Sequence, residues 1–300
     1  MEDWNTPHTT YTELALRKDW KALLKADSRR LVNCVSRQGL SILEHHQPNF
    51  WNVENSKGQS IAKNWNNPEL RKEAEERTMK HYTKMYKSEV RRNIAFYSGS
   101  PLPTAYRPLL AKSIVDFCNA KKVLDCSIGW GGRMIGTLAL EGTTFEGCEP
   151  CSATYDGLVN IVSFLGMEDR VKLHKAGAED VLPTLPSQSY DLMITSPPYY
   201  NLEIYSHEES QSIKKFPSWD EWIEKFIEPV VREVLRCLKE DGVSAWSVKN
   251  FRKYKLQDII FQLHKKYGWE HTETFAMTST PRNKGETSKV GEETFLFKKV

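Results

Sequence analysis

Four consecutive residues, Ser196-Pro197-Pro198-Tyr199, have the types and spacing that point most directly to chemistry. The prolines fix φ and donate no N–H, so the carbonyl oxygens of Ser196 and Pro197 are held rigidly with their lone pairs available. A hydroxyl and a fixed carbonyl together accept both hydrogens of an –NH2 group, which turns its nitrogen lone pair toward an electrophile. Tyr199 supplies a flat face for the attached ring. The segment therefore predicts a site that positions an amine on a ring.

A glycine-rich turn, residues 127–133, follows a short apolar run that ends near Asp125. Glycine lets a backbone approach a ligand closely and adopt dihedral angles that a Cβ atom forbids. Phosphate sites use the same device, but an acid beside the ligand repels phosphate and attracts an ammonium group. The turn and its acid therefore favour a nucleoside that carries an amino acid over a nucleotide.

Further acids stand at the ends of the next two expected strands. Glu149 ends the first of them, and its carboxylate can accept hydrogen bonds from both hydroxyls of a ribose. Glu179 and Asp180 follow the second and offer an acceptor for the amino group of an adenine. Because the carboxyl ends of parallel strands meet at one edge of a sheet, these acids and Asp125 outline a ligand with an amine, a diol and an adenine.

From Lys121 onward, short apolar runs alternate with amphipathic stretches, which is typical of βαβ units in a parallel sheet. The expected strands are 122–126, 144–149, 171–175, 190–195, 242–248, 270–277 and 293–299. The expected helices are 108–119, 131–141, 152–165, 219–239 and 255–267. The sequence thus predicts an α/β fold, with a mostly parallel sheet of seven strands and helices on both faces.

Residues 1–105 differ from the remainder in pattern and in charge. Helical spacing appears at 14–25 and 69–97, and Ser98–Pro103 breaks any helix, so we expect a domain boundary there and domains of 1–105 and 106–300. The first segment holds 17 Lys and Arg against 12 Asp and Glu, whereas the second holds 25 against 27. This basic helical region predicts a DNA-binding or recognition element, with an ordinary solvated surface as the alternative.

Composition narrows the class of protein. The chain has 300 residues, 39% of them hydrophobic and 27% charged, which predicts a globular protein with a sizeable core. No apolar run approaches the roughly 20 residues that cross a bilayer, and the first residues lack a secretory signal, so we expect a cytoplasmic protein without a membrane partner. Of the six cysteines only Cys148 and Cys151 form a C-x-x-C pair, so we expect structural thiols and no metal site.

Residues 125–133 and Ser196–Tyr199 together resemble the motifs of the amino methyltransferases of DNA, which form N4-methylcytosine or N6-methyladenine. The longer strings Gly129–Arg133 and Thr195–Tyr205 are similar to a phage and bacterial branch of DNA methylases. The resemblance covers about residues 105–300. It implies the Rossmann-like methyltransferase sheet, S-adenosylmethionine as cofactor, and double-stranded DNA as partner, with the target base flipped out of the duplex.

The resemblance also implies roles for individual residues. Its cofactor-binding set is Asp125, Ser127, Gly129, Gly131, Glu149, Glu179 and Asp180. Within that set, Asp125 and the Gly129–Gly131 turn would hold the methionine portion, Glu149 the ribose, and Glu179 or Asp180 the adenine. Its catalytic set is Ser196, Pro197, Pro198 and Tyr199. We further expect Tyr200 and Asn201 to line the base pocket, and Arg282 and Lys284 to contact the DNA backbone.

Two departures from the family pattern and two other classes of protein qualify this interpretation. Cys126-Ser127 replaces the Pro-Phe or Pro-Tyr that commonly follows the first acid, and no large recognition domain separates the two motifs. Serine at position 196 resembles the cytosine-N4 branch more than the adenine-N6 branch. The alternatives are an RNA base methyltransferase and a non-catalytic DNA-binding or antirestriction protein of the same shape.

Overall fold

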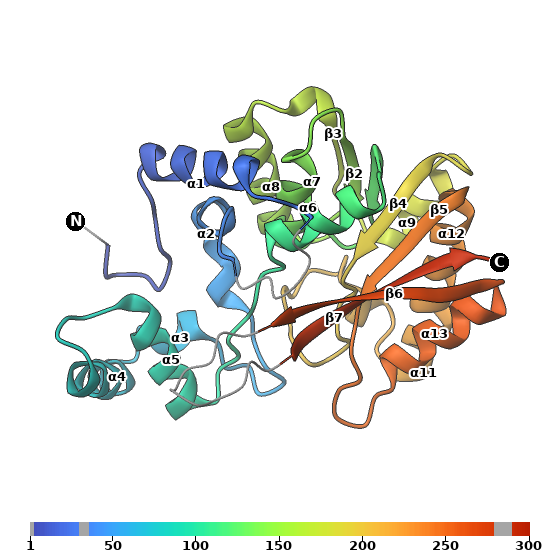
Figure 1. The fold of residues 1–300 in the computed structure, drawn as a ribbon. Coiled ribbons are helices and arrows are strands. Elements are labelled where there is room, and N and C mark those ends of the chain that lie inside the picture. The colour runs from blue at the N-terminus through green and yellow to red at the C-terminus, as the bar shows by residue number, and fades with distance from the viewer. Residues whose placement is uncertain (1–2, 30–35, 279–289) are drawn as a thin grey trace.

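A single mixed sheet of seven strands organises the protein in the computed structural model, which describes residues 3–29, 36–278 and 290–300 (Figure 1). The strands are β1 Lys122–Asp125, β2 Thr144–Cys148, β3 Val171–His174, β4 Tyr190–Thr195, β5 Leu238–Ser247, β6 Trp269–Thr278 and β7 Val290–Lys299. Their order across the sheet is β3-β2-β1-β4-β5-β7-β6. The first five strands pair in parallel, and β7 lies antiparallel between β5 and β6. The predicted fold class is confirmed.

Two hydrophobic clusters cover the two faces of this sheet, because successive strand residues point to opposite sides. On β1, for example, Val123 belongs to one cluster and Leu124 to the other. The first cluster includes residues of α6 Pro108–Phe117, α7 Gly132–Leu138 and α8 Ser152–Leu165. The second includes residues of α9 Ala178–Val181, α12 Glu228–Cys237 and α13 Leu256–Lys266. The central strands β1 and β4 are largely buried on both faces, which explains their apolar sequence, whereas β3 at the edge of the sheet is only partly buried.

The predicted helix 219–239 is interrupted in the structure. It consists of α11 Trp219–Trp222, a π-helical turn at Ile223–Ile227 and α12. Pro229 lies in the first turn of α12, where it has no N–H to donate to the carbonyl one turn back. A π-turn is one way for a helix to pass such a defect. Two short elements complete this region, α10 Ser212–Lys215 and the 3-10 turn Leu182–Thr184.

The N-terminal region is helical, as the spacing predicts. Its elements are α1 Glu13–Lys25, α2 Leu40–His46, a 3-10 turn η1 at Pro48–Asn52, α3 Ile61–Trp65, α4 Pro68–His81 and α5 Lys87–Ser98. The predicted stretch 69–97 is thus divided between α4 and α5, with Tyr82 in extended backbone after α4. The chain reverses there so that Ala74 of α4 packs with Val90 and Ile94 of α5 in a small cluster.

The hydrophobic core continues across the predicted boundary at residue 105. Leu23, Leu43 and Phe50 from the N-terminal region belong to the same cluster as Leu158 and Ile161 of α8. Figure 1 shows α1 and α2 beside α8, and α3, α4 and α5 farther from the sheet. Within the described residues, no helix has the length and apolar character needed to cross a membrane.

Candidate functional site

A cavity at the carboxyl ends of the parallel strands brings the two predicted motifs together. It encloses about 1080 Å3 of empty space, including the mouth that is open to solvent. Its lining includes residues from the glycine turn, from the ends of β2 and β3, and from the segment after β4. Of the predicted site residues it contains Ser127, Gly129, Glu149, Glu179, Ser196, Pro197 and Pro198. A ligand in this cavity would contact both motifs, as expected for a site at this edge of an α/β sheet.

The glycines of the turn bring the backbone close to its neighbours. Gly129 has a φ of +59°, and its N–H donates to Oε2 of Glu149 at 3.0 Å. At Gly132 a Cβ atom would stand 2.0 Å from the carbonyl oxygen of Tyr106, so only glycine fits. Gly131 has a φ of +91° and is buried, facing Leu158 rather than the cavity. The turn therefore holds Glu149 on one side and the segment 104–106 on the other.

Glu149 is buried, with 7% of its surface exposed, yet its carboxylate lines the cavity. Its oxygens accept hydrogen bonds from the backbone N–H groups of Gly129, at 3.0 Å, and Cys151, at 2.8 Å. Burial raises the pKa of Glu149 to about 7, although the two backbone donors lower it. Each oxygen keeps a lone pair for a further donor, so this carboxylate can accept a pair of hydroxyls.

Two buried polar atoms in the cavity lining have no hydrogen-bond partner among the described residues. These are Oε2 of Glu179 and Nε2 of Gln211. The other oxygen of Glu179 is held by Nζ of Lys215 at 2.7 Å, which also contacts the exposed Asp180 at 2.5 Å. Buried polar groups are nearly always paired in native proteins, so an acceptor and a donor left over in one cavity indicate a polar ligand.

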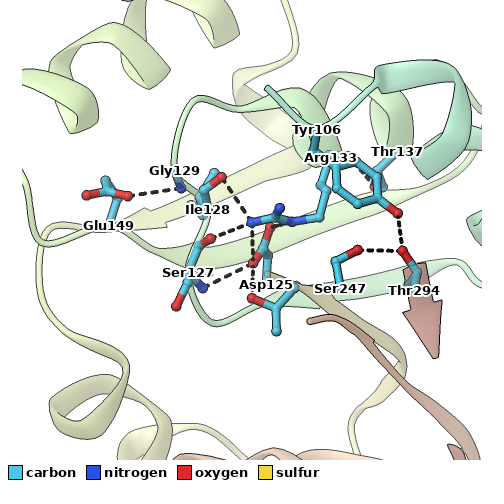
Figure 2. A network of polar contacts seen from close by, with 11 residues as sticks. Tyr106, Asp125, Ser127, Ile128, Gly129, Arg133, Thr137, Glu149, Ser247 and Thr294 are labelled. Atoms are coloured by element: carbon cyan, nitrogen blue, oxygen red, sulfur yellow. Dashed lines mark hydrogen bonds and ion pairs between the residues drawn. The ribbon is translucent and has the colours of Figure 1, made fainter. Parts of the chain in front are cut away.

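Asp125 does not belong to the cavity lining, and it lies within the network of polar contacts that Figure 2 shows. Its carboxylate is fully buried and accepts from Arg133 Nε at 2.7 Å, Thr195 Oγ1 at 2.8 Å and the N–H of Ser127 at 3.0 Å. Arg133, by contrast, does line the cavity. A direct contact between Asp125 and a ligand stays a prediction.

The Ser-Pro-Pro-Tyr string begins in the cavity and turns away from it. Ser196, Pro197 and Pro198 line the cavity, whereas Tyr199 is 6% exposed and packs edge-on against Phe251, with ring centroids 5.3 Å apart. Tyr200 has a left-handed φ of +47°, which is costly for a bulky residue. Its hydroxyl donates to the carbonyl of Pro217 at 2.6 Å, and its ring contacts Trp219, Trp222 and Tyr254.

The remaining predicted substrate-binding residues are placed as follows. Asn201 is half-buried, and its Oδ1 has no partner among the described residues. Arg282 and Lys284 lie outside the described residues. Neither Tyr200 nor Asn201 belongs to the lining of the cavity.

Several cavity residues were not anticipated from the sequence. They include Thr104, Ala105, Tyr106, Gln211 and Phe226. No motif marks residues 104–106, which reach the site because the chain passes along Gly132 on its way to α6. Phe226 belongs to a helix that its apolar spacing assigns to the core, and it is indeed part of the second cluster while lining the cavity.

The strand order, together with a ligand cavity at the carboxyl ends of β1, β2, β3 and β4, defines a Rossmann-like fold of the methyltransferase class. Residues 190–300 match the N6/N4 methyltransferase family, described as DNA methylase. The matched segment begins with β4 and contains the Ser-Pro-Pro-Tyr string. The resemblance to the DNA amino methyltransferases is thereby confirmed over this part of the chain.

Individual relatives and solved structures are similar to parts of the chain. Over 105 residues it is 28% identical to the type II methyltransferase M.SfiI of Streptomyces fimbriatus, covering 35% of this chain and 24% of that enzyme. The chain therefore spans about a quarter of the length of this curated relative. Among solved structures, precorrin-8w decarboxylase of Methanobacterium thermoautotrophicum is 13% identical, with a TM-score of 0.45, over 67% of this chain and 93% of that one. An S-adenosylmethionine-dependent methyltransferase of Agrobacterium tumefaciens is 13% identical, with a TM-score of 0.43, over 62% and 58%.

The family implies S-adenosylmethionine as the cofactor, and the chemistry of the cavity fits that molecule. Glu149 offers a buried carboxylate suited to a ribose diol, and the unpartnered Oε2 of Glu179 suits the amino group of an adenine. The glycine turn between β1 and α7 leaves the adjoining space free of side chains, since nothing lies within 4 Å of a Cβ atom built on Gly129.

Proposed function

We propose that this protein transfers a methyl group from S-adenosylmethionine to an exocyclic amino group of a base in DNA. The observation that carries the proposal is the single cavity that joins Glu149, the glycine turn and Glu179 to Ser196–Pro198. A cofactor held by the first three groups would have its reactive end directed along the same cavity as the acceptors that orient an amine. The match of residues 190–300 to the DNA methylase family supports DNA as the substrate.

The residues of the string would act by orientation rather than as strong bases. When bound, the cofactor supplies an electrophilic methyl group on a sulfonium centre. The Ser196 hydroxyl and the Pro197 carbonyl would accept the two hydrogens of the amine and stabilise the positive charge that develops on its nitrogen. The amine proton would then pass to solvent or to a neighbouring acceptor.

We favour N4 of cytosine over N6 of adenine as the target atom. The first residue of the string is serine, and in the resemblance described above this residue is associated with the cytosine branch. A neutral hydroxyl accepts a hydrogen bond from either amine, so the physical preference is slight. The identity of the modified nucleoside therefore has to be measured.

The test is mass spectrometry of nucleosides from DNA and RNA of cells that express the chain. We expect N4-methylcytosine in DNA, its loss in Ser196→Ala, and its retention in Ser163→Ala, a control on the exposed face of α8. N6-methyladenine instead would correct the target base and keep the class of enzyme. Methylation confined to RNA, or no modified base at all, would overturn the proposal.

We also propose that DNA contacts the α4–α5 hairpin. Much of the basic excess of the N-terminal region is used internally: Lys87 donates to the His8 carbonyl at 2.5 Å, and Arg91 donates to the Pro7 carbonyl at 2.6 Å. The hairpin nevertheless exposes Lys72, Lys80, Lys84 and Arg92, and it also exposes the aromatic residues Tyr82, Tyr86, Phe96 and Tyr97. Exposed cations interleaved with aromatic rings suit a nucleic-acid backbone and its bases.

Charge neutralisation tests this surface without disturbing the shared core. Lys80→Gln with Lys84→Gln should weaken duplex binding and flatten the plot of log K against log salt by about 1.8, because each phosphate that a lysine no longer neutralises removes about 0.9 from the slope. The matched control is Lys121→Gln with Lys239→Gln. These lysines lie at the amino ends of β1 and β5, at the edge of the sheet opposite the cavity. Equal salt slopes for the two double variants would contradict the proposed surface.

A further inference from the structure

Arg133 is a cation whose hydrogen-bonding capacity is only partly used by the protein. Its Nε and Nη2 donate to the Asp125 carboxylate, and Nη2 also donates to the carbonyls of Ser127, at 2.5 Å, and Ile128, at 3.2 Å. The second terminal nitrogen, Nη1, has no hydrogen-bond partner among the described residues. A buried guanidinium carries five N–H donors in a fixed plane, so two of them remain for another group.

The surroundings of Arg133 direct those donors to the cavity. Arg133 is 4% exposed and belongs to the cavity lining, and its guanidinium carbon lies 5.3 Å from the ring centroid of Tyr106, another lining residue. Figure 2 shows the guanidinium between Asp125, the turn carbonyls and Tyr106. Among the described residues that line the cavity, Arg133 is the only lysine, arginine or histidine.

We infer that Arg133 binds the carboxylate of the cofactor's methionine portion and that Asp125 is a positioning residue, which acts by fixing the guanidinium. The inference rests on the proposed function, since it requires an amino-acid-bearing nucleoside in the cavity. It also gives Asp125 a role that its buried position allows, because both of its oxygens are already occupied by protein donors.

Charge and geometry both favour a carboxylate as the group that Arg133 binds. The cavity also presents the acids Glu149 and Glu179, so one cation stands opposite the one anionic group of such a ligand. Burial lowers the pKa of Arg133, but the charge of Asp125 and its hydrogen bonds raise it above the usual value, so the guanidinium stays charged. The planar N–H groups of arginine match the two oxygens of a carboxylate better than a lysine ammonium does.

The experiment is calorimetric binding of three ligands to the full chain: S-adenosylhomocysteine, its analogue without the carboxylate, and its analogue without the amino group. The variant is Arg133→Lys, which keeps a charge beside Asp125 and loses the planar fork. The matched control is Arg170→Lys, an arginine that donates to the carbonyls of Leu140 and Thr143 and lies outside the cavity lining. Thermal unfolding of each variant shows whether it is folded.

We expect the wild-type protein to bind the decarboxylated analogue at least tenfold more weakly than S-adenosylhomocysteine, as for a missing charge-assisted hydrogen bond. Arg133→Lys should lower the affinity for S-adenosylhomocysteine and for the deaminated analogue by a similar factor. It should change the affinity for the decarboxylated analogue by less than twofold. Arg170→Lys should change the affinity for each of the three ligands by less than twofold.

Other outcomes overturn the inference in distinguishable ways. Equal weakening of all three ligands by Arg133→Lys would make Arg133 a structural residue of the turn. If Arg133→Lys weakens binding of S-adenosylhomocysteine and of the decarboxylated analogue but not of the deaminated analogue, Asp125 would contact the ammonium group directly. If Arg133→Lys does not fold, the wild-type comparison decides alone, because equal binding of S-adenosylhomocysteine and its decarboxylated analogue excludes a carboxylate contact. Binding of none of the three would overturn the proposed function itself.

Discussion

Glu54 and Ile204 exchange two backbone hydrogen bonds, of 3.0 Å and 2.9 Å, and so form an isolated antiparallel bridge. Glu54 belongs to the N-terminal region, between η1 and α3, and Ile204 to the loop that follows the Ser-Pro-Pro-Tyr string. The Glu54 carboxylate also contacts Lys63 at 2.7 Å and His207 at 3.3 Å. The N-terminal region thus holds one side of the loop that leaves the candidate catalytic centre.

A second contact fixes the same loop to the sheet domain, and it provides the first prediction. Glu208 accepts hydrogen bonds from the N–H of Ser152, at 3.1 Å, and from its hydroxyl, at 2.9 Å, and thereby caps α8. Glu208→Ala should lower the free energy of unfolding by about 0.5–2 kcal/mol, the usual effect of losing a cap. It should also speed amide exchange in residues 201–211. The control is Glu209→Ala at the exposed neighbouring position, and equal effects of the two variants in urea unfolding and hydrogen exchange would contradict this role.

The shared core gives the second prediction. Leu43 in α2 is fully buried in the cluster that also contains Leu158 and Ile161 of α8. Leu43→Ala should lower the free energy of unfolding of the whole protein by about 2–5 kcal/mol, because a cavity replaces buried methyl groups. Leu14→Ala in α1, where leucine is 81% exposed, should change it little. Urea unfolding followed by the fluorescence of the tryptophans measures both. A separate transition for the N-terminal region, with the sheet domain unaffected, would contradict a common core.

The sequence predicted the sheet domain well because its signals are local. Strands β1 and β4 are short, mostly apolar and mostly buried runs, and an acidic residue ends β1 and follows β2 directly. The cavity therefore contains Glu149, Glu179 and Ser196 as expected.

What the sequence did not predict depends on interactions between distant residues. Nothing local shows that Arg133 would return to Asp125, that Gln211 would reach the cavity, or that Glu54 would pair with Ile204. A helix-breaking segment does precede the boundary that we expected near residue 105. The core that Leu43 shares with α8 across this boundary has no signature in composition or charge.

Glu149 gives the third prediction, on the pH dependence of stability. Because burial raises its pKa from 4.5 to about 7, the folded state holds this proton more tightly than the unfolded chain does. The stabilising contribution is complete below pH 4.5 and is lost as the pH rises through 7. The stability of the wild type relative to Glu149→Gln should therefore fall by about 3 kcal/mol between about pH 4.5 and pH 8, at 1.36 kcal/mol per pH unit.

The difference between variants is the quantity to measure, because His264 acts in the opposite direction. Burial lowers the pKa of His264 to about 4, so its contribution is lost as the pH falls below 6.5. The control Glu73→Gln, at an exposed position of α4, should give a curve parallel to that of the wild type. A constant difference between wild type and Glu149→Gln from pH 4.5 to 8 in urea unfolding would show that this carboxyl titrates normally.

The fourth prediction is that substitutions of Ser196 and of Tyr199 impair different steps, the rate of methyl transfer and the capture of the base, respectively. Ser196 lines the cavity and would orient the amine, so Ser196→Ala should lower the single-turnover rate of methyl transfer by about 10²-fold or more. Affinity for DNA and for the cofactor should stay nearly unchanged, because the interaction strengthens only in the transition state. A wild-type rate in Ser196→Ala would show that the catalytic centre lies elsewhere.

Tyr199 should instead affect capture of the base. Its ring packs on Phe251 and lies 5.8 Å from Nζ of Lys249, so its orientation is fixed, and stacking on a flipped base would require this buried ring to become accessible. Tyr199→Ala should weaken binding of a duplex with an extrudable target by about 1–3 kcal/mol, and Tyr199→Phe should largely restore it because the ring remains. The fluorescence of 2-aminopurine at the target position reports base flipping directly. If Tyr199→Ala flips the base as the wild type does while transfer slows, Tyr199 supports the geometry of Ser196 through its packing and does not stack on the substrate.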